Sequence, residues 1–279
     1  MEAPAPGDEV GVLLWDKPAG PTSHDVIKQI RRETGLRAGH AGTLDPFATG
    51  LLVGLLGRAT RLQQYLVGLP KRYLATARYG WTSSTGDRDG VLEQTGRLPD
   101  TLEIPSGTFG QQVPMTSAAK VSGERLYRKA HRGESVSDRP VREVTVYRSE
   151  LLDLEEDSDG SPLRGRYRLE VSSGTYVRSL VSDLGDAYCE ELRRTSVGSL
   201  DVRDAGRLVD PAEALSFMPS LELEEDEAGA IANGIPVRTR PDLQEGAAVR
   251  LVRASVLLGV GRTEGDRVRP EVVLRPAAG

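Results

Sequence analysis

The sequence is poor in cysteine and histidine, and it has no long apolar run. Its single cysteine, Cys189, has no partner for an internal disulfide, which fits the cytoplasm, where we expect the protein to reside. The longest apolar run, residues 51–56, is far shorter than the roughly 20 residues of a membrane-spanning helix, so no membrane role is expected. The histidines His24, His40 and His131 lack the spacing of metal ligands, and no metal site is predicted.

Common cofactor and nucleophile motifs are also missing. The glycine-rich run at residues 50–57 has neither the G-x-G-x-x-G spacing of a dinucleotide site nor the Lys-Ser/Thr pair of a P-loop, and no G-x-S-x-G elbow occurs. These absences argue against the usual nucleotide cofactors and against a serine hydrolase of that type. Residues 1–9 are acidic and proline-rich without the basic start and apolar core of a signal peptide, so we expect a flexible tail.

Charge is present but unevenly distributed. The formal net charge is −5, and two runs, residues 153–160 and 222–227, carry five acids each and no base. Such runs are usually solvated loops or linkers. Residues 120–142 hold seven bases against three acids. That segment is a candidate contact for a polyanion, although a solvated helix face is the more common reason for such a pattern.

The hydrophobic patterns mix helices and strands throughout the chain. Residues 22–35 read as a helix that Thr22 or Ser23 caps and Gly35 ends, and residues 175–188 read as a second helix capped by Thr175. Residues 50–57 read as a buried strand. We therefore predict an α/β (α+β) fold: a mixed central sheet with flanking helices, and a small β-rich C-terminal domain. The predicted division is a catalytic domain at 10–220, an acidic linker at 221–227 and the small domain at 228–279.

Asp45 stands out in the segment GHAGTLDPFATG, residues 39–50. Pro46 disfavours the helical region for the residue before it, which holds the aspartate in an extended conformation. The surrounding glycines leave backbone bare for the close approach of a ligand. An Asx-turn or a helix cap is the ordinary alternative for an isolated Asp-Pro pair. The sequence places no other acid nearby, so a nucleophile or a base is the chemical role we consider for Asp45.

Arg178 occupies the first turn of the helix predicted at residues 175–188, where the helix dipole disfavours a cation. This position suggests a specific partner, and a carboxylate is the obvious one because a guanidinium pairs with it and keeps it ionised. A surface arginine remains the simple alternative. Tyr73 and Tyr176 are equally compatible with tyrosines at the edge of the core.

Taken together, these blocks resemble the TruB family of tRNA pseudouridine synthases over nearly the whole chain. The resemblance rests on ordered segments: LLWDKPAGPTSHDV, GHAGTLDPFATGLLVGLLGRATRLQQYL, KRYLATARYG, STGDRDG, QQVPMTSAAKVSGERLYRKAHRGE, SSGTYVRSLVSDLG, LRRTSVG and ANGIPV. It implies a pseudouridine synthase fold with a PUA-like C-terminal RNA-binding domain. The implied activity is isomerisation of uridine 55 in the T-arm of tRNA, without a cofactor, by a protein that we expect to be a monomer.

The resemblance also implies roles for individual residues. Asp45 would be the catalytic aspartate, and Arg178 would pair with it. Tyr73 would stack on the uracil and take part in its proton transfer. His40 would fill the space that the target uridine vacates when it leaves the loop stack.

Further positions would support the substrate. Lys17 and Pro18 would buttress the active-site tyrosine, Leu192 would line the pocket, and Tyr176 is a further candidate for substrate binding. The basic segment would supply RNA contacts from Lys120, Arg132 and Arg142.

Two other functions stay open on the sequence alone. The first is a non-catalytic tRNA-binding or folding module on the same scaffold. The second is a hydrolase that uses Asp45 on another glycosidic bond, but that chemistry usually needs a second carboxylate at a defined separation, which the sequence does not place near Asp45.

Overall fold

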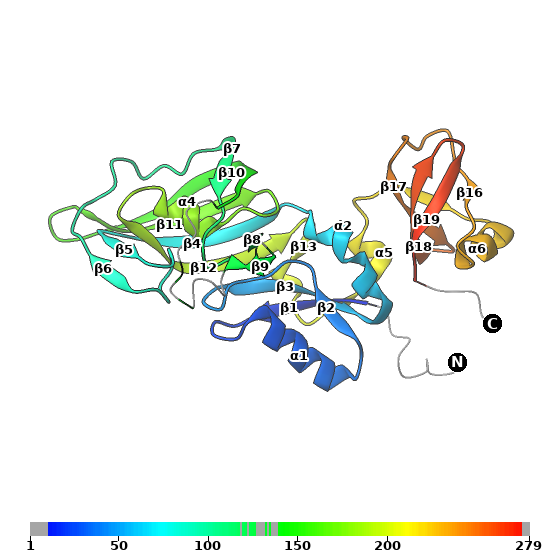
Figure 1. Ribbon diagram of the computed structural model, residues 1–279, viewed down its shortest axis with the longest axis horizontal. Coiled ribbons are helices and arrows are strands. Elements are labelled where there is room, and N and C mark those ends of the chain that lie inside the picture. The colour runs from blue at the N-terminus through cyan, green and yellow to red at the C-terminus, as the bar shows by residue number, and fades with distance from the viewer. Residues whose placement is uncertain are drawn as a thin grey trace.

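The computed structural model describes residues 11–117, 119–121, 123–126, 132, 134 and 139–274, so the tail expected at residues 1–9 lies outside the described residues. A ten-stranded sheet and a five-stranded sheet dominate this part of the chain (Figure 1). No helix in the described residues is long and apolar enough to cross a membrane. The predicted combination of a mixed α/β domain with a small C-terminal β domain is confirmed.

The large sheet is built from strands between residues 11 and 209. Its strand order is β14-β1-β3-β12-β4-β11-β10-β7, with β2 beside β3 and β13 beside β12. Its strands are β1 (Gly11–Lys17), β2 (Ala38–His40), β3 (Thr49–Leu56), β4 (Lys71–Tyr79), β7 (Gly107–Gln112), β10 (Val141–Glu156), β11 (Pro162–Val171), β12 (Ala187–Val197), β13 (Leu200–Asp201) and β14 (Leu208–Val209). The β3–β12 pair is parallel and the other pairs are antiparallel, so the sheet is mixed. Strand β3 is the buried strand predicted at residues 50–57.

Helices cover the two halves of this sheet separately. Helix α1 (Ser23–Thr34) begins after Thr22, whose side chain accepts from the Asp25 amide in a capping box, and it ends at Gly35 in the left-handed region, as predicted. Its apolar side packs on β2 and β3. Helix α4 (Val177–Ser182) packs on the other half of the sheet. The cap expected from Thr175 is wrong, because the helix begins after Tyr176 and has no side-chain cap.

Short elements connect the strands. A 3-10 turn, η1 (Gly57–Leu62), leads into helix α2 (Gln63–Val67), and the strands β5 (Trp81–Ser83) and β6 (Leu92–Gln94) form a separate hairpin. The strands β8 (Lys120–Val121) and β9 (Glu124–Arg125) pair with each other. Most residues of the basic segment between β9 and residue 139 lie outside the described residues. The elements η2 (Val202–Asp204) and α5 (Pro211–Ala214) lead towards the C-terminal domain.

The C-terminal domain has its own sheet and core. Its strands are β15 (Ser220–Glu222), β16 (Val237–Arg238), β17 (Ala248–Arg253), β18 (Val256–Glu264) and β19 (Arg267–Val273), and helix α6 (Glu225–Ala232) packs against them. The acidic linker expected at residues 221–227 is wrong. Strand β15 pairs in parallel with β17, and Glu224 and Glu227 form a capping box at the start of α6. The acids there favour a helix N-terminus, where the dipole attracts negative charge.

The two domains share one apolar core. It combines side chains of β1, β3, η1 and α2 with Val252, Leu257, Val260, Val272 and Leu274 of the C-terminal sheet. Polar contacts reinforce the junction: Arg58 and Arg61 donate to the Leu274 and Val273 carbonyls, and Tyr65 donates to Glu271 at 2.8 Å. The C-terminal domain therefore packs directly on the segment that follows β3.

Gly50 fixes the crossing of β3 and β12. Arg194 lies beside Gly50 in the parallel register, and Gly50 has a φ of +100°. A Cβ at this position would collide with the Arg194 backbone. Only glycine allows both the conformation and the close approach.

We expect Gly50→Ala to lower the free energy of unfolding by at least about 2 kcal/mol, because the side chain adds backbone strain to a steric clash. Gly229→Ala is the matched control. Gly229 lies in helix α6, and a Cβ added there would meet no neighbouring group within 4 Å, so the substitution should stabilise by about 0.5–1 kcal/mol. Urea unfolding of both variants measures the difference, and equal effects would contradict this account of Gly50.

Candidate active site

A cavity of about 310 Å³ opens between the Asp45 loop and the start of helix α4. Six of the residues predicted from the sequence line it together: Asp45, Tyr73, Arg142, Tyr176, Arg178 and Leu192. They come from the loop between β2 and β3, from strands β4, β10 and β12, and from the start of α4. Residues far apart in the sequence thus meet around one space of nucleoside size.

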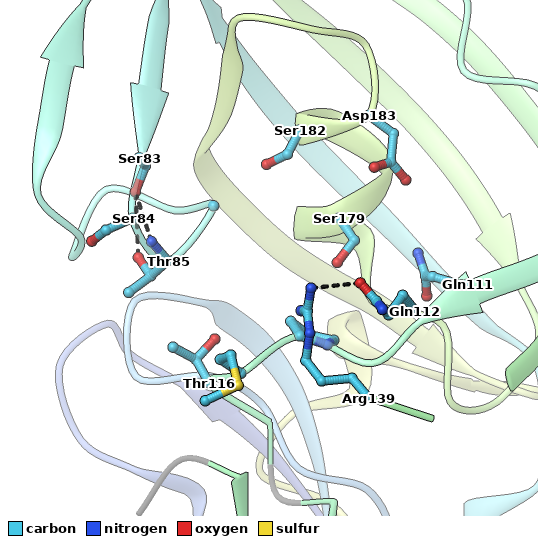
Figure 2. Close-up of a pocket in the computed structure, with 13 residues that line it drawn as sticks. Ser83, Ser84, Thr85, Gln111, Gln112, Thr116, Arg139, Ser179, Ser182 and Asp183 are labelled. Atoms are coloured by element: carbon cyan, nitrogen blue, oxygen red, sulfur yellow. Dashed lines mark hydrogen bonds between the residues drawn. The ribbon is translucent and has the colours of Figure 1, made fainter. Parts of the chain in front are cut away.

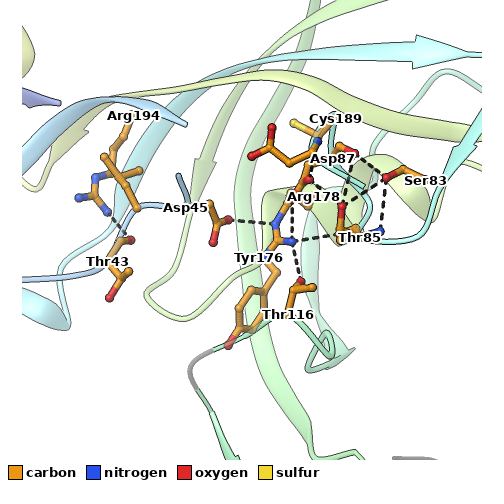
Figure 3. Close-up of polar contacts among 12 residues, drawn as sticks. Thr43, Asp45, Ser83, Thr85, Asp87, Thr116, Tyr176, Arg178, Cys189 and Arg194 are labelled. Atoms are coloured by element: carbon orange, nitrogen blue, oxygen red, sulfur yellow. Dashed lines mark hydrogen bonds and ion pairs between the residues drawn. The ribbon is translucent and has the colours of Figure 1, made fainter. Parts of the chain in front are cut away.

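Arg178 joins two carboxylates at the side of this cavity (Figure 3). Its Nε lies 2.9 Å from Asp45 Oδ2, and its Nη1 lies 2.9 Å from Asp87 Oδ2. Nη1 also donates to the Thr85 carbonyl and to Thr116 Oγ1, at 3.0 and 2.7 Å. The arginine is only 3% exposed. Its position in the helix suggested a carboxylate partner, and the family resemblance implied Asp45; the structure contains that pair.

The expectation that Asp45 has no acid nearby is wrong, because Asp87 pairs with the same arginine. Asp87 lies 42 positions further along the chain, in the turn after β5, and is buried. The Thr85 hydroxyl donates to Asp87 Oδ1 at 2.7 Å, and the Asp89 amide donates to the same atom at 3.1 Å. Sequence reasoning missed Asp87, although it lies in the STGDRDG block that carried part of the family resemblance.

The surroundings of Asp45 disfavour its ionised form. Burial raises the pKa of the Asp45 carboxyl above its usual value, and the negative charge of Asp87 raises it further. The Arg178 and Lys17 cations lower the pKa, but they do not cancel the effect of burial. Arg178 therefore favours the ionised carboxyl, as expected, but burial outweighs its effect. The site holds a carboxylate whose negative charge is less stable than in water.

The Asp45 loop is fastened at several points. The Ser23 hydroxyl donates to the Leu44 carbonyl at 3.0 Å and accepts from the Leu44 amide at 2.8 Å. Lys17 Nζ donates to the carbonyls of Pro18, Pro46 and Ala48. These bonds fix the backbone on both sides of Asp45.

Lys17 therefore has contacts beyond those expected. Its ammonium supports the Asp45 loop, and Pro18 is exposed, while their packing against Tyr73 stays a prediction. Burial lowers the pKa of Lys17 to about 8, while Asp45 opposes this shift. Tyr73 is 7% exposed on β4 and lines the cavity beside Leu192.

His40 ends strand β2 and is half-buried, outside the set of residues that line the cavity. Its carbonyl accepts from Gln63 Nε2 of α2 at 3.0 Å. Burial lowers the pKa of His40, and the nearby Arg194 cation lowers it further. The imidazole is thus mainly neutral at pH 7, which suits a steric role better than an electrostatic one.

The basic residues of the segment 120–142 lie in different environments. Arg142 is exposed and lines the cavity. Arg132, expected to contact RNA, is held by Glu124 and Glu134, each at 2.7 Å. These two carboxylates offset its charge. The Lys120 side chain lies outside the described residues, although its backbone belongs to β8.

Two buried cations, Lys71 and Arg194, also line the cavity, and sequence reasoning missed both. A signal for them exists. Lys71 lies two positions before Tyr73 on β4, and Arg194 lies two positions after Leu192 on β12. Alternate residues of a strand share a face, so both cations point the same way as the predicted residues.

A second cavity, of about 470 Å³, lies against the other side of α4 (Figure 2). Hydroxyl and amide groups line it, including Ser83, Gln112, Ser179 and Ser182, and Arg139 donates to Gln112. It shares Thr85 and Thr116 with the contacts of Arg178. In the described residues, no group of three metal-ligating side chains gathers at either cavity.

We expect Asp87→Asn to lower the free energy of unfolding by about 3 kcal/mol, because it removes one charge from a buried ion pair. Asp89→Asn is the matched control. Asp89 is exposed two residues away, and its loss should change stability by less than about 0.5 kcal/mol. Denaturant unfolding at pH 7 compares the two variants, and equal stabilities would argue against a structural role for the Asp87–Arg178 pair.

Comparisons with known proteins agree with this arrangement. Residues 28–177 match the model described as TruB family pseudouridylate synthase (N terminal domain), and residues 219–274 match Pseudouridine synthase II TruB, C-terminal. The sequence is 41% identical over 260 residues to tRNA pseudouridine synthase B of Thermobifida fusca, covering 87% of this chain and 84% of that protein. It is 34% identical over 290 residues to the same-named protein of Aquifex aeolicus, covering 95% and 99%.

The fold is also similar to a solved structure. A chain in the crystal structure of a Cbf5-Nop10-Gar1 complex superposes with a TM-score of 0.72 at 25% identity, covering 97% of this chain and 86% of that one. The family resemblance inferred from the sequence is thus confirmed over both domains. The chain belongs to the TruB family of pseudouridylate synthases, which are isomerases.

Proposed function

We propose that the protein isomerises uridine to pseudouridine at position 55 in the T-arm of tRNA, with Asp45 as the catalytic carboxylate. The observation that carries the proposal is the Asp45–Arg178 pair at a cavity of nucleoside size. Among the described residues that line this cavity, Asp45 is the only acid. The relatives named tRNA pseudouridine synthase B support tRNA as the substrate.

The reaction exchanges one glycosidic bond for another. The N1–C1′ bond of the uridine breaks, a C5–C1′ bond forms, the C5 proton leaves and N1 gains a proton. A fixed carboxylate can act on the sugar or on the ring as a nucleophile, or can assist the elimination as a base. Arg178 keeps Asp45 oriented at the cavity for any of these steps, and Asp87 fixes Arg178 in turn.

The base reaches the carboxylate only after it leaves the RNA stack. Unstacking costs a few kcal/mol, and the cost is lower in a loop than in a duplex. Tyr73 offers an aromatic surface for the extruded base inside the cavity. We propose that His40, uncharged and at the edge of the same loop, fills the space that the base leaves in the RNA.

Asp45→Asn should abolish isomerisation while RNA binding persists. The measurement is tritium release from tRNA transcript labelled at uridine C5, with tRNA affinity measured in parallel. Release by Asp45→Asn at the wild-type rate would remove Asp45 from the chemistry. No release from either protein, with tRNA bound tightly by both, would favour the non-catalytic alternative, and release of free uracil would favour the hydrolase.

Stability serves as the control for Asp45→Asn. The pKa of Asp45 is higher in the folded protein than in the unfolded chain. The stability of the protein therefore falls as the pH rises from the pKa of the unfolded state to that of the folded state. Above the folded pKa the neutral asparagine avoids this loss. The variant should therefore be at least as stable as the wild type at pH 7.5. The difference should shrink as the pH falls through about 4, where the unfolded state also begins to take up the proton.

Arg142→Ala should weaken RNA binding through the loss of a phosphate contact. Each contact with single-stranded nucleic acid contributes roughly 0.7 to the slope of log Kd against log salt concentration, so the slope should fall by about that amount. Arg148→Ala is the control, because Arg148 lies on the same strand, is exposed and pairs with Glu150. An unchanged slope for Arg142→Ala would remove Arg142 from the RNA interface.

A further inference from the structure

Lys71 and Arg194 are buried cations that have no acidic partner among the described residues. Lys71 is 6% exposed and Arg194 is 1% exposed, and both line the cavity that holds Asp45. In the described part of the chain, no carboxylate lies within ion-pair distance of either one. Arginine and lysine are rarely buried unless a negative charge accompanies them. The pair therefore calls for an explanation beyond packing.

Backbone carbonyls hold both cations in place. Lys71 Nζ donates to the Val67 carbonyl at 2.8 Å and to the Leu69 carbonyl. Arg194 donates to the carbonyls of Leu51, Thr43 and Gly42, at 2.7, 3.3 and 3.1 Å (Figure 3). An ammonium has three donors, so Lys71 keeps one N–H for a ligand in the cavity that it lines.

The two cations flank the beginning of the Asp45 loop. A Cβ on Gly42 would lie 3.6 Å from Arg194 Nη1 and 3.7 Å from Lys71 Cε. Their strands, β12 and β4, are paired, with Arg194 opposite Tyr73. The side of the cavity next to Gly42 is thus positive, while Asp45 and its partner Arg178 occupy another side (Figure 3).

Burying these two adjacent cations lowers the stability of the protein when no ligand is bound. Burial lowers the pKa of Lys71 to about 8, and the adjacent Arg194 cation lowers it further. Neutral donors could bond the same carbonyls without this cost. In the described residues around the loop, the buried cations Lys17, Lys71, Arg178 and Arg194 outnumber the carboxylates that act on them, which are Asp45, Asp87 and the exposed Asp89. A bound anion would balance the excess.

We propose that Lys71, with Arg194 behind it, binds negative charge that the target nucleotide brings into the cavity. The charge comes either from the phosphodiester of that nucleotide or from the uracil ring as the N1–C1′ bond breaks and its electron pair passes to the base. Both sources present an anion to the same ammonium. The inference rests on the proposed function and assigns a binding role to a residue outside the Asp45–Arg178 pair.

The test compares Lys71→Met with Arg72→Met. Arg72 is the next residue on β4, but it is exposed and pairs with Glu170 outside the cavity, so its loss removes the same charge from a different surface. Single-turnover tritium release at saturating tRNA, tRNA affinity across salt concentrations and the free energy of unfolding are measured for both variants.

Lys71→Met should lower either the single-turnover rate or the affinity for tRNA by roughly 10-fold to 100-fold. A lower rate at saturating tRNA with unchanged affinity identifies charge on the uracil. Weaker binding with a smaller salt slope and an unchanged rate identifies the phosphodiester. A folded Lys71→Met variant with the wild-type rate and affinity overturns the proposal. The proposed function fails separately, if the wild type itself releases no tritium.

A pH profile distinguishes an effect of the Lys71 charge from a structural effect of the substitution. The wild-type rate or affinity should fall as the pH rises through about 8, where Lys71 loses its proton. Lys71→Arg keeps a cation at higher pH and should move this loss upward, whereas an unchanged loss in a folded Lys71→Arg variant overturns the proposal and assigns the loss to Lys17. The other titratable or charged groups that line the cavity are Asp45, Tyr73, Arg142, Tyr176, Arg178 and Arg194.

Discussion

The guanidinium of Arg178 holds the site together because it pairs with two carboxylates from different parts of the chain. Asp45 comes from the loop between β2 and β3, and Asp87 comes from the turn after β5. With Arg178 buried on α4, the three elements are fixed relative to one another. Ion pairs of this kind contribute less to stability than to geometry, since desolvation opposes the attraction between the charges. Here that geometry keeps the Asp45 carboxylate at the cavity.

Charge is arranged around the Asp45 loop at a cost in stability. Burial raises the pKa of Asp45 and lowers the pKa values of Lys17 and Lys71, so all three groups are less stable in their charged forms than in water. Carbonyl oxygens accept hydrogen bonds from the cations without neutralising their charge. Active sites commonly hold such preorganised charges, because they act on a reacting group without rearranging.

The C-terminal domain is linked to the site through the segment from η1 to α2. Tyr65 bonds Glu271, which also pairs with Arg262, while the neighbouring Gln63 holds the carbonyl of His40. At the end of α2, the Val67 carbonyl accepts from Lys71 and from the Ser173 hydroxyl. One short helical segment thus contacts the second domain on one side and residues around the cavity on another. Its position depends on the apolar core that both domains share.

The sequence by itself determined the local elements and the main chemical residues. Helix α1 follows from its capping threonine and terminal glycine, β3 follows from its apolar run, and Asp45 and Arg178 were identified from their unusual positions and from the family motifs. These features depend on residues close together in the chain, where spacing carries the information. The acidic run at residues 222–227 predicts a linker by composition alone, but the same composition suits a helix N-terminus equally well, and the structure has a helix there.

Only the tertiary structure decided which charges meet. The approach of Asp87 to Arg178, the support that Lys17 gives to the Asp45 loop and the pairing of Arg132 with two glutamates all join residues through the folded surface. The direction of the pKa shift of Asp45 likewise depends on its burial, which no spacing in the sequence gives. Desolvation and Coulomb interactions depend on distances in space, and the fold sets those distances by bringing remote strands together.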